Sequence, residues 1–170
     1  MDITMITLIV AVVAMLVSFY TFYFVNEQRK KAKTNDDGYT SRPLQLQAYE
    51  RLVMLTERIA LPSIVSRANQ SQPGMNARDM QMLLLESIKQ EYEYNATQQI
   101  YVSPVAWEAV RSLKDQNMLI INQLSSTLPA EASGLDLNKR IMEFAMTQKK
   151  GTIHEVVLEA LNFEAKKLMK

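Results

Sequence analysis

Side chains that could take part in catalysis or metal binding are few in this sequence. The 170 residues include one histidine, His154, and no cysteine. That composition excludes disulfide scaffolds, thiol catalysis, zinc fingers and iron–sulfur clusters. Glu91 and Glu93 point to different sides of a helix, whereas a carboxylate acid–base pair must converge in one pocket. Because glycine-rich phosphate loops and nucleophile elbows are also missing, we expect no enzyme, no metal and no cofactor.

Aromatic side chains gather around one expected loop, at Tyr92, Tyr94, Tyr101 and Trp107. The favoured interpretation is that they pack on the core and hold the loop in place. The alternative is that Tyr94, Tyr101 and Trp107 form a surface on which a partner protein docks, because Tyr and Trp are enriched at binding hot spots. The sequence leaves both interpretations open.

The elements that carry these residues are expected to be helices. Their starts and interruptions are marked by proline and by capping residues: a helix opening at Pro43, an interruption near 60–61 caused by Pro62, a cap at Asn76, a start at Ser103-Pro104, a shorter helix over 135–146, and a capping box at Thr152–Glu155. We interpret His154, inside that box, as an exposed or capping residue. The segment 98–104 is expected to be extended.

Asn117 is the one polar residue in a helical stripe. Ala106, Val110, Leu113, Asn117, Ile120 and Leu124 recur at intervals of three and four residues. In an ordinary bundle helix Asn117 would face a wet edge, which is the favoured interpretation. In a coiled coil it would instead fix the register of the pair.

Residues 3–25 contain no charge, no proline and no glycine. A helix over this range is roughly 35 Å long, enough to cross the hydrocarbon core of a bilayer. The run is longer than the apolar core of a cleaved signal peptide and ends in aromatic residues typical of a membrane boundary. The sequence therefore predicts a retained transmembrane anchor helix within 1–28.

Small or hydroxylated residues form one stripe along this predicted span. They are Thr4, Thr7, Ala11, Ala14, Ser18 and Thr21. Helices associate in lipid by close packing over small side chains and by hydroxyl hydrogen bonds. The stripe therefore predicts contact with another transmembrane helix, of a different membrane protein or of an identical chain. The alternative is that the small residues merely face lipid.

A basic cluster follows the span: Arg29, Lys30, Lys31 and Lys33. By the positive-inside rule it places the N-terminus outside and residues 29–170 in the cytoplasm, at a bacterial inner membrane. The cluster either only sets this topology or also binds anionic lipid headgroups. From Thr34 onward, 15 basic residues stand against 16 acidic ones. We therefore expect no nucleic acid as partner.

The chain as a whole is predicted to be all-α, with an anchor at 1–28, a basic then polar linker at 29–42, and a cytoplasmic bundle of four to five helices at 43–170. An apolar segment followed by PLQLQAYERLVMLTERIALP and later by YVSPVAWEAV resembles short bacterial single-span membrane proteins of unassigned function. The resemblance implies no functional residues.

Two functions follow from this organisation. The first is a membrane-anchored, non-enzymatic accessory or scaffolding subunit of a larger inner-membrane complex, with its span packed on another transmembrane helix. The alternative is a stand-alone or homodimeric membrane-surface scaffold that binds anionic lipid through the basic cluster. Neither function predicts a small-molecule substrate.

Overall fold

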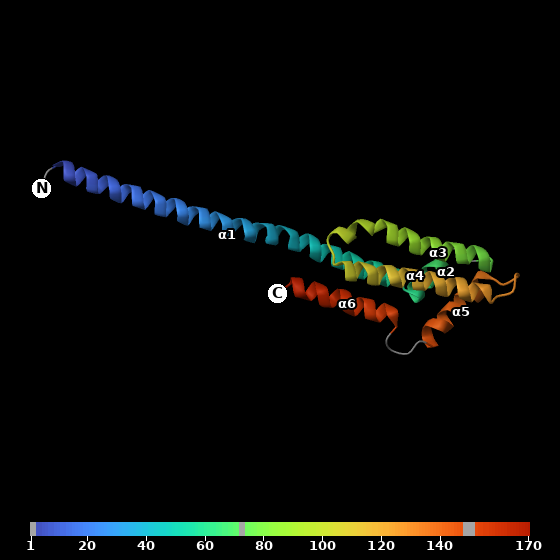
Figure 1. The fold of residues 1–170 in the computed structure, drawn as a ribbon. Helices are drawn as coiled ribbons and strands as arrows, with labels where there is room; N and C mark the ends of the chain where they lie inside the picture. Colours follow the sequence, from blue (N-terminus) through green and yellow to red (C-terminus); the bar gives the residue numbers. More distant parts are fainter. Residues whose placement is uncertain (1–2, 72–73, 148–151) are drawn as a thin grey trace. The chain divides into compact units, whose positions relative to one another are not determined.

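The computed structural model describes residues 3–71, 74–147 and 152–170, and every element in these ranges is helical (Figure 1). In chain order the elements are α1 (Ile3–Ile59), α2 (Leu61–Ser71), α3 (Ala77–Tyr94), the 3₁₀ helix η1 (Ala96–Ile100), α4 (Pro104–Ser126), α5 (Gly134–Thr147) and α6 (Ile153–Leu168). Side chains of α1 are described at position 15, over 18–27 and from 41 onward. The expected all-helical class is confirmed for the described ranges.

The predicted membrane span is not supported. Among the residues that the structure describes, no helix is both long enough and apolar enough to cross a bilayer. The stretch 18–27 contains four polar residues, Ser18, Thr21, Asn26 and Glu27, among its aromatic ones. Helix α1 also continues past the apolar run through polar sequence to Ile59. The prediction of a transmembrane helix over 1–28 is therefore wrong, and the orientation inferred from it loses its basis.

Most residues of the predicted helix contact have side chains outside the described residues: Thr4, Thr7, Ala11 and Ala14. Ser18 and Thr21 are described and exposed, and the Thr21 hydroxyl donates to the Ser18 carbonyl at 3.0 Å within the same helix. The side chains of the basic cluster, Arg29, Lys30, Lys31 and Lys33, also lie outside the described residues. Lipid binding by that cluster stays a prediction.

The chain divides into two compact units, 1–43 and 44–170, and we call the second unit the body. The stretch 29–42 was predicted to be a linker, but it belongs to α1, as does Pro43, which was predicted to open a helix. A proline inside a helix removes one backbone hydrogen bond. Good helix formers follow Pro43 over 44–48, whereas residues 34–41 before it are poor helix formers.

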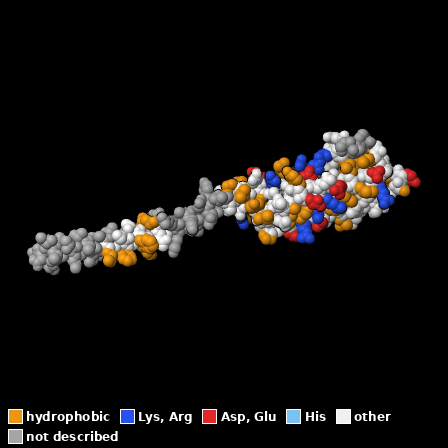
Figure 2. Space-filling view, turned by 90° about the horizontal axis from the view of Figure 1, so that it is seen from above, with side chains coloured by type: hydrophobic (Ala, Val, Ile, Leu, Met, Phe, Trp, Pro, Cys, Tyr) orange, Lys and Arg blue, Asp and Glu red, His pale blue; other side chains and the backbone are white. Residues whose placement is uncertain are grey.

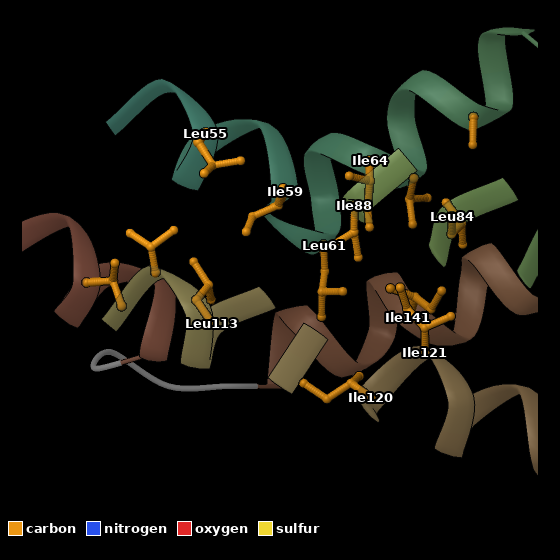
Figure 3. Close-up of a cluster of buried hydrophobic side chains, with 14 of the residues drawn as sticks. Leu55, Ile59, Leu61, Ile64, Leu84, Ile88, Leu113, Ile120, Ile121 and Ile141 are labelled. Carbon is orange, nitrogen blue, oxygen red and sulfur yellow. The ribbon is translucent and has the colours of Figure 1, made fainter. Parts of the chain in front are cut away.

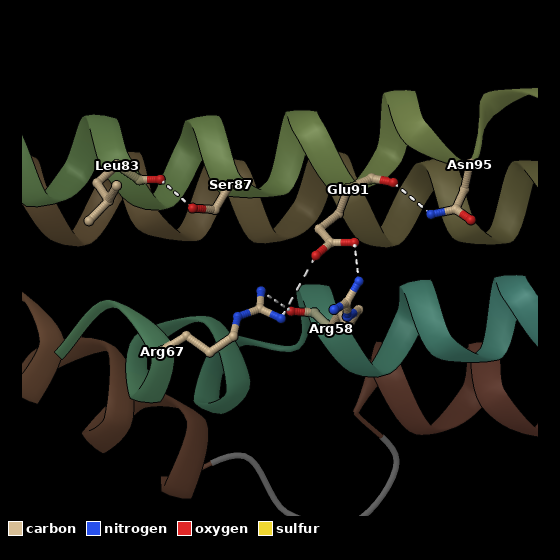
Figure 4. Close-up of polar contacts among 6 residues, drawn as sticks. All are labelled: Arg58, Arg67, Leu83, Ser87, Glu91 and Asn95. Atoms are coloured by element: carbon tan, nitrogen blue, oxygen red, sulfur yellow. Dashed lines mark hydrogen bonds and ion pairs between the residues drawn. The ribbon is translucent and has the colours of Figure 1, made fainter. Parts of the chain in front are cut away.

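The break between α1 and α2 falls where Pro62 predicted it. Proline has no N–H, so it cannot bond the carbonyl of Arg58 four residues earlier. The Arg67 guanidinium donates to that carbonyl at 2.9 Å (Figure 4). From α4, the Asn117 side-chain amide donates to the next carbonyl, that of Ile59, at 2.8 Å. Asn117 is only 4% exposed, so the interpretation that it faces a wet edge is wrong.

The core of the body is one cluster of aliphatic side chains to which every α-helix contributes (Figure 3). Its fully buried members are Leu52, Leu55, Ile59, Ile64, Met80, Leu84, Ile88, Leu113, Ile121, Leu137, Ile141 and Leu161. Those in α1, α3 and α5 are three or four residues apart, which is the spacing of one buried helix face. Helix α3 packs on α4 and α5, α2 packs on α5, and α4 packs on α6.

The starts of α3 and α5 are joined directly. Asn76 caps α3 as predicted, accepting a hydrogen bond from the Asp79 amide at 2.8 Å. The Gly134 amide at the start of α5 donates to the Met75 carbonyl at 2.7 Å. A Cβ at Gly134 would lie 3.0 Å from that carbonyl oxygen and 3.0 Å from the Met80 Cβ. Glycine therefore allows this close approach.

A candidate docking surface around the 3₁₀ helix

The connection between α3 and α4 is a hydrogen-bonded turn and not the extended segment that the sequence predicted. Asn95 ends α3: its backbone amide bonds the Tyr92 carbonyl at 3.1 Å, and its side-chain amide bonds the Glu91 carbonyl at 2.9 Å (Figure 4). Helix η1 follows, and the Tyr101 amide closes it on the Gln98 carbonyl at 3.0 Å. The backbone of this turn is therefore held by local hydrogen bonds along its length.

Ser103 joins the end of this turn to two distant helices. Its hydroxyl accepts from the Ala106 amide at 3.0 Å, the helix cap that the sequence predicted. The same hydroxyl donates to the Glu164 carboxylate of α6 at 2.6 Å. The Ser103 amide donates to the Tyr49 hydroxyl of α1 at 3.1 Å, and that hydroxyl donates to Glu164 at 2.5 Å. We call Tyr49, Ser103 and Glu164 the three-helix junction.

The electrostatics of the junction favour a neutral tyrosine. Burial, reinforced by the hydrogen bond to Glu164, raises the pKa of Tyr49 above its ordinary value of 10.0. The serine hydroxyl and the tyrosine hydroxyl are both bonded to the same carboxylate. The junction therefore satisfies its own polar groups and positions the turn.

Large uncharged side chains are exposed on this turn and on the helix residues that flank it. Tyr94, Ile100 and Val105 are 72–73% exposed, and Tyr101 is 40% exposed. We call these four residues the η1 patch. Figure 2 shows that hydrophobic side chains lie exposed among charged ones on the surface of the body, and these four fall within twelve consecutive residues, 94–105. Clustered apolar exposure of this kind is typical of interaction sites.

The aromatic residues of the sequence prediction therefore divide into two groups. Tyr94 and Tyr101 belong to the exposed patch. Trp107 is partly buried against the core, and its ring lies 5.1 Å from that of Tyr92. The Lys114 ammonium lies over the Tyr92 ring, 4.7 Å from its centre. Trp107 thus packs on the core and on Tyr92, as the packing interpretation has it.

A second polar cluster lies beside the helix break. Glu91 of α3 pairs with Arg58 at 3.2 Å and with Arg67 at 3.9 Å (Figure 4). A hollow of about 430 Å³ is lined by these residues together with Ser87, Gln90 and Tyr94. Because both arginines already face Glu91, the cluster joins α1, α2 and α3 and offers little net positive charge to an anion.

The only histidine lies in a mostly apolar hollow of about 310 Å³ at the same break. His154 Nε2 is 3.4 Å from a Glu57 carboxylate oxygen, and the imidazole is 27% exposed. Leu61, Ile120 and Phe144 line the walls. His154 was interpreted as an exposed or capping residue; its side chain is only partly exposed, and Thr152 is the residue that caps α6. Among the described residues, no three His, Cys, Asp or Glu side chains come close enough to hold a metal ion.

Several residues of the surface were missed from the sequence. Ile100 had a usable signal, since it is a large aliphatic residue that follows the polar run Thr97-Gln98-Gln99. Val105 is the second residue of α4, beside the predicted helix start at Ser103-Pro104. Tyr49 and Glu164 had none, because they meet Ser103 across 54 and 61 positions of sequence. Such contacts are set by the packing of helices and not by local pattern.

Fold and surface define a small all-helical protein with a braced apolar turn. The chain belongs to a family of unknown function, DUF7935, whose model matches residues 1–168. No curated protein and no solved structure matches it. The family agrees with the resemblance to proteins of unassigned function, and it adds neither a source organism nor a cellular location.

Proposed function

We propose that this protein is a non-enzymatic accessory or scaffolding subunit that binds another protein through the η1 patch. The observation that carries the proposal is the exposure of four large uncharged side chains within residues 94–105, on a turn braced by the three-helix junction. Single exposed apolar residues are ordinary, but a cluster of them with two tyrosines has the composition of a binding hot spot.

The rigidity of the turn supports the same proposal. Binding loses affinity when a loop must be ordered at the moment of association. Here the turn is already ordered by Asn95, by the η1 hydrogen bonds and by Ser103. The patch can therefore keep most of the free energy that is gained when its side chains are buried.

The chemistry of the patch indicates the kind of partner. Tyrosine presents an apolar ring and a hydroxyl that can bond polar groups at the margin of an interface. Glu93, which is exposed beside Tyr94, adds negative charge at the rim. We expect a protein surface with an apolar centre and a lysine or arginine opposite Glu93. A nucleic acid would be repelled at this rim because its backbone is anionic.

Site-specific cross-linking in the native host tests the proposal. A photoreactive phenylalanine analogue replaces Tyr94, Ile100 or, as control, Gln116, which is exposed on α4. The expected result is an adduct with the same protein from positions 94 and 100, and none from 116. Equal adducts at all three positions, or none at 94 and 100, would contradict the proposal. An adduct consisting only of a second copy of this chain would also contradict it.

Titration of the purified partner then measures the contribution of each residue. Tyr94→Ala or Ile100→Ala should each raise the dissociation constant by about 10- to 30-fold, as expected of hot-spot residues. Glu93→Lys should slow association, because it places a positive charge opposite the basic rim. Gln116→Ala should leave the dissociation constant unchanged. Equal affinity of all these variants would refute the assignment of the patch.

A further inference from the structure

Helix α6 has an apolar stripe on its outer side. Val157 and Leu161 point inward and are buried. Ile153, Val156 and Phe163 lie on an adjoining face and are 40%, 55% and 61% exposed. With Ala160, which is half-buried, they repeat at intervals of three, four and three residues. We call these four residues the outer stripe; their spacing is that of a seam along which two helices pack.

Charge is separated along the exposed side of α6. Glu155 and Glu159 lie in its first half, and Lys166 and Lys167 lie in its last turn. The Lys167 ammonium bends back over the Phe163 ring, 4.4 Å from its centre. One end of the stripe is therefore flanked by acidic residues and the other by basic residues.

We propose that the outer stripe is the contact between two copies of this chain, with their α6 helices packed antiparallel. A two-fold axis between positions 161 and 162 places Ala160 opposite Phe163 of the second copy, so that a large side chain fills the space over a small one. The same register places Val156 opposite the aliphatic stem of Lys167 and brings Glu159 close to Lys166. Each contact occurs twice because the pair is symmetric.

Side-chain charge and size select this orientation. Glu159 and Lys166 are seven residues apart and lie on one flank of the stripe, and in a parallel pair each flank faces the opposite flank of the second copy, so these two residues would not meet. A parallel pair would also set Phe163 against Phe163 and leave Ala160 opposite Ala160, which fills space poorly. Antiparallel packing brings acidic side chains close to basic ones and places large side chains opposite small ones.

This inference does not depend on the η1 patch, because the outer stripe lies on α6 whereas the patch lies on α3, η1 and α4. Tyr94→Ala and Ile100→Ala should leave self-association unchanged. Phe163→Ser should abolish self-association and leave partner cross-linking at position 100 in place. The two proposals can therefore fail separately.

Cysteine cross-linking measures the orientation, and the full chain suits it because it has no native cysteine. Full chains carrying Glu159→Cys and Lys166→Cys, with different tags, are mixed and oxidised. The mixed-tag disulfide should form at least about tenfold faster than a pair of Glu159→Cys and Lys89→Cys, in which the second site is exposed on α3. Faster coupling of 159 to 159 and of 166 to 166 would overturn the antiparallel arrangement. Coupling no faster than the control would overturn the contact itself.

Charge reversal provides the second measurement, by sedimentation of the full chain over a range of concentrations. Glu159→Lys alone and Lys166→Glu alone should each raise the dimer dissociation constant by about tenfold, since two attractive pairs become repulsive. The double variant E159K/K166E restores the opposite charges and should return to the wild-type value. A chain that stays monomeric, or a double variant no better than the single ones, would refute the pairing.

Discussion

Asn117→Ala removes the only side-chain donor seen at the Ile59 carbonyl in the described residues. The deleted amide lies 2.8 Å from that oxygen and Asn117 is 4% exposed, so water cannot readily take its place. Leaving a buried acceptor without its partner costs about 1–3 kcal/mol. Alanine is the better helix former by roughly 0.6 kcal/mol, which offsets part of this loss. We expect the free energy of unfolding to fall by about 1–2 kcal/mol.

Urea unfolding of the full chain provides the assay, with fluorescence of the single tryptophan, Trp107, as the probe. The midpoint should fall while the denaturant slope stays constant, because the surface exposed on unfolding hardly changes. Gln116→Ala, next to Asn117 in sequence but exposed, is the matched control. If Asn117→Ala destabilised the chain no more than Gln116→Ala, Asn117 would not stabilise the helix break and the reasoning would be refuted.

Three further predictions concern the rest of the body. Tyr49→Phe removes one hydrogen-bond acceptor and one donor from the three-helix junction. It should lower the free energy of unfolding by about 1–2 kcal/mol. An unchanged midpoint in urea would contradict the claim that the junction stabilises the turn. Burial is the main cause of the raised pKa values of Tyr49 and Tyr92. Because these tyrosines ionise at lower pH in the unfolded chain, their contribution to the free energy of unfolding is present below pH 10 and is lost as the pH rises further. In Tyr92→Phe this alkaline loss of stability should be smaller than in wild type. Gly134→Ala places a Cβ 3.0 Å from the Met75 carbonyl oxygen and from the Met80 side chain. The free energy of unfolding should fall by about 1–3 kcal/mol. A thermal midpoint equal to that of wild type would show that the starts of α3 and α5 can separate without loss of stability.

Local chemistry predicted most of the helix ends in the body. Pro62, Asn76, Ser103 and Thr152 each end or open a helix where the sequence indicated, because a missing N–H or a capping oxygen acts on neighbouring backbone atoms. The inward face of α4 was also readable, since helical spacing fixes which side chains point the same way. These signals are contained within a few residues.

Two kinds of feature were not predicted: contacts between residues far apart in the sequence, and the full extent of helix α1. Asn117 finds its carbonyl 58 positions away, so its burial could not be read from its own helix. The continuation of α1 through 29–42 could not be read from helix propensity, because residues 34–41 are all poor helix formers. The span prediction treated the apolar run as a separate helix, whereas the described residues form one helix that ends at Ile59.

The three-helix junction also sets an order in time. Proteins are synthesised from the N-terminus, and helices can form as they leave the ribosome. Tyr49 and Ser103 emerge first, and Glu164 follows 61 residues after the serine. Until α6 has been made and has folded back, the serine hydroxyl lacks its carboxylate partner. The turn near residue 100 can therefore complete its hydrogen bonds only after residue 164 has been synthesised.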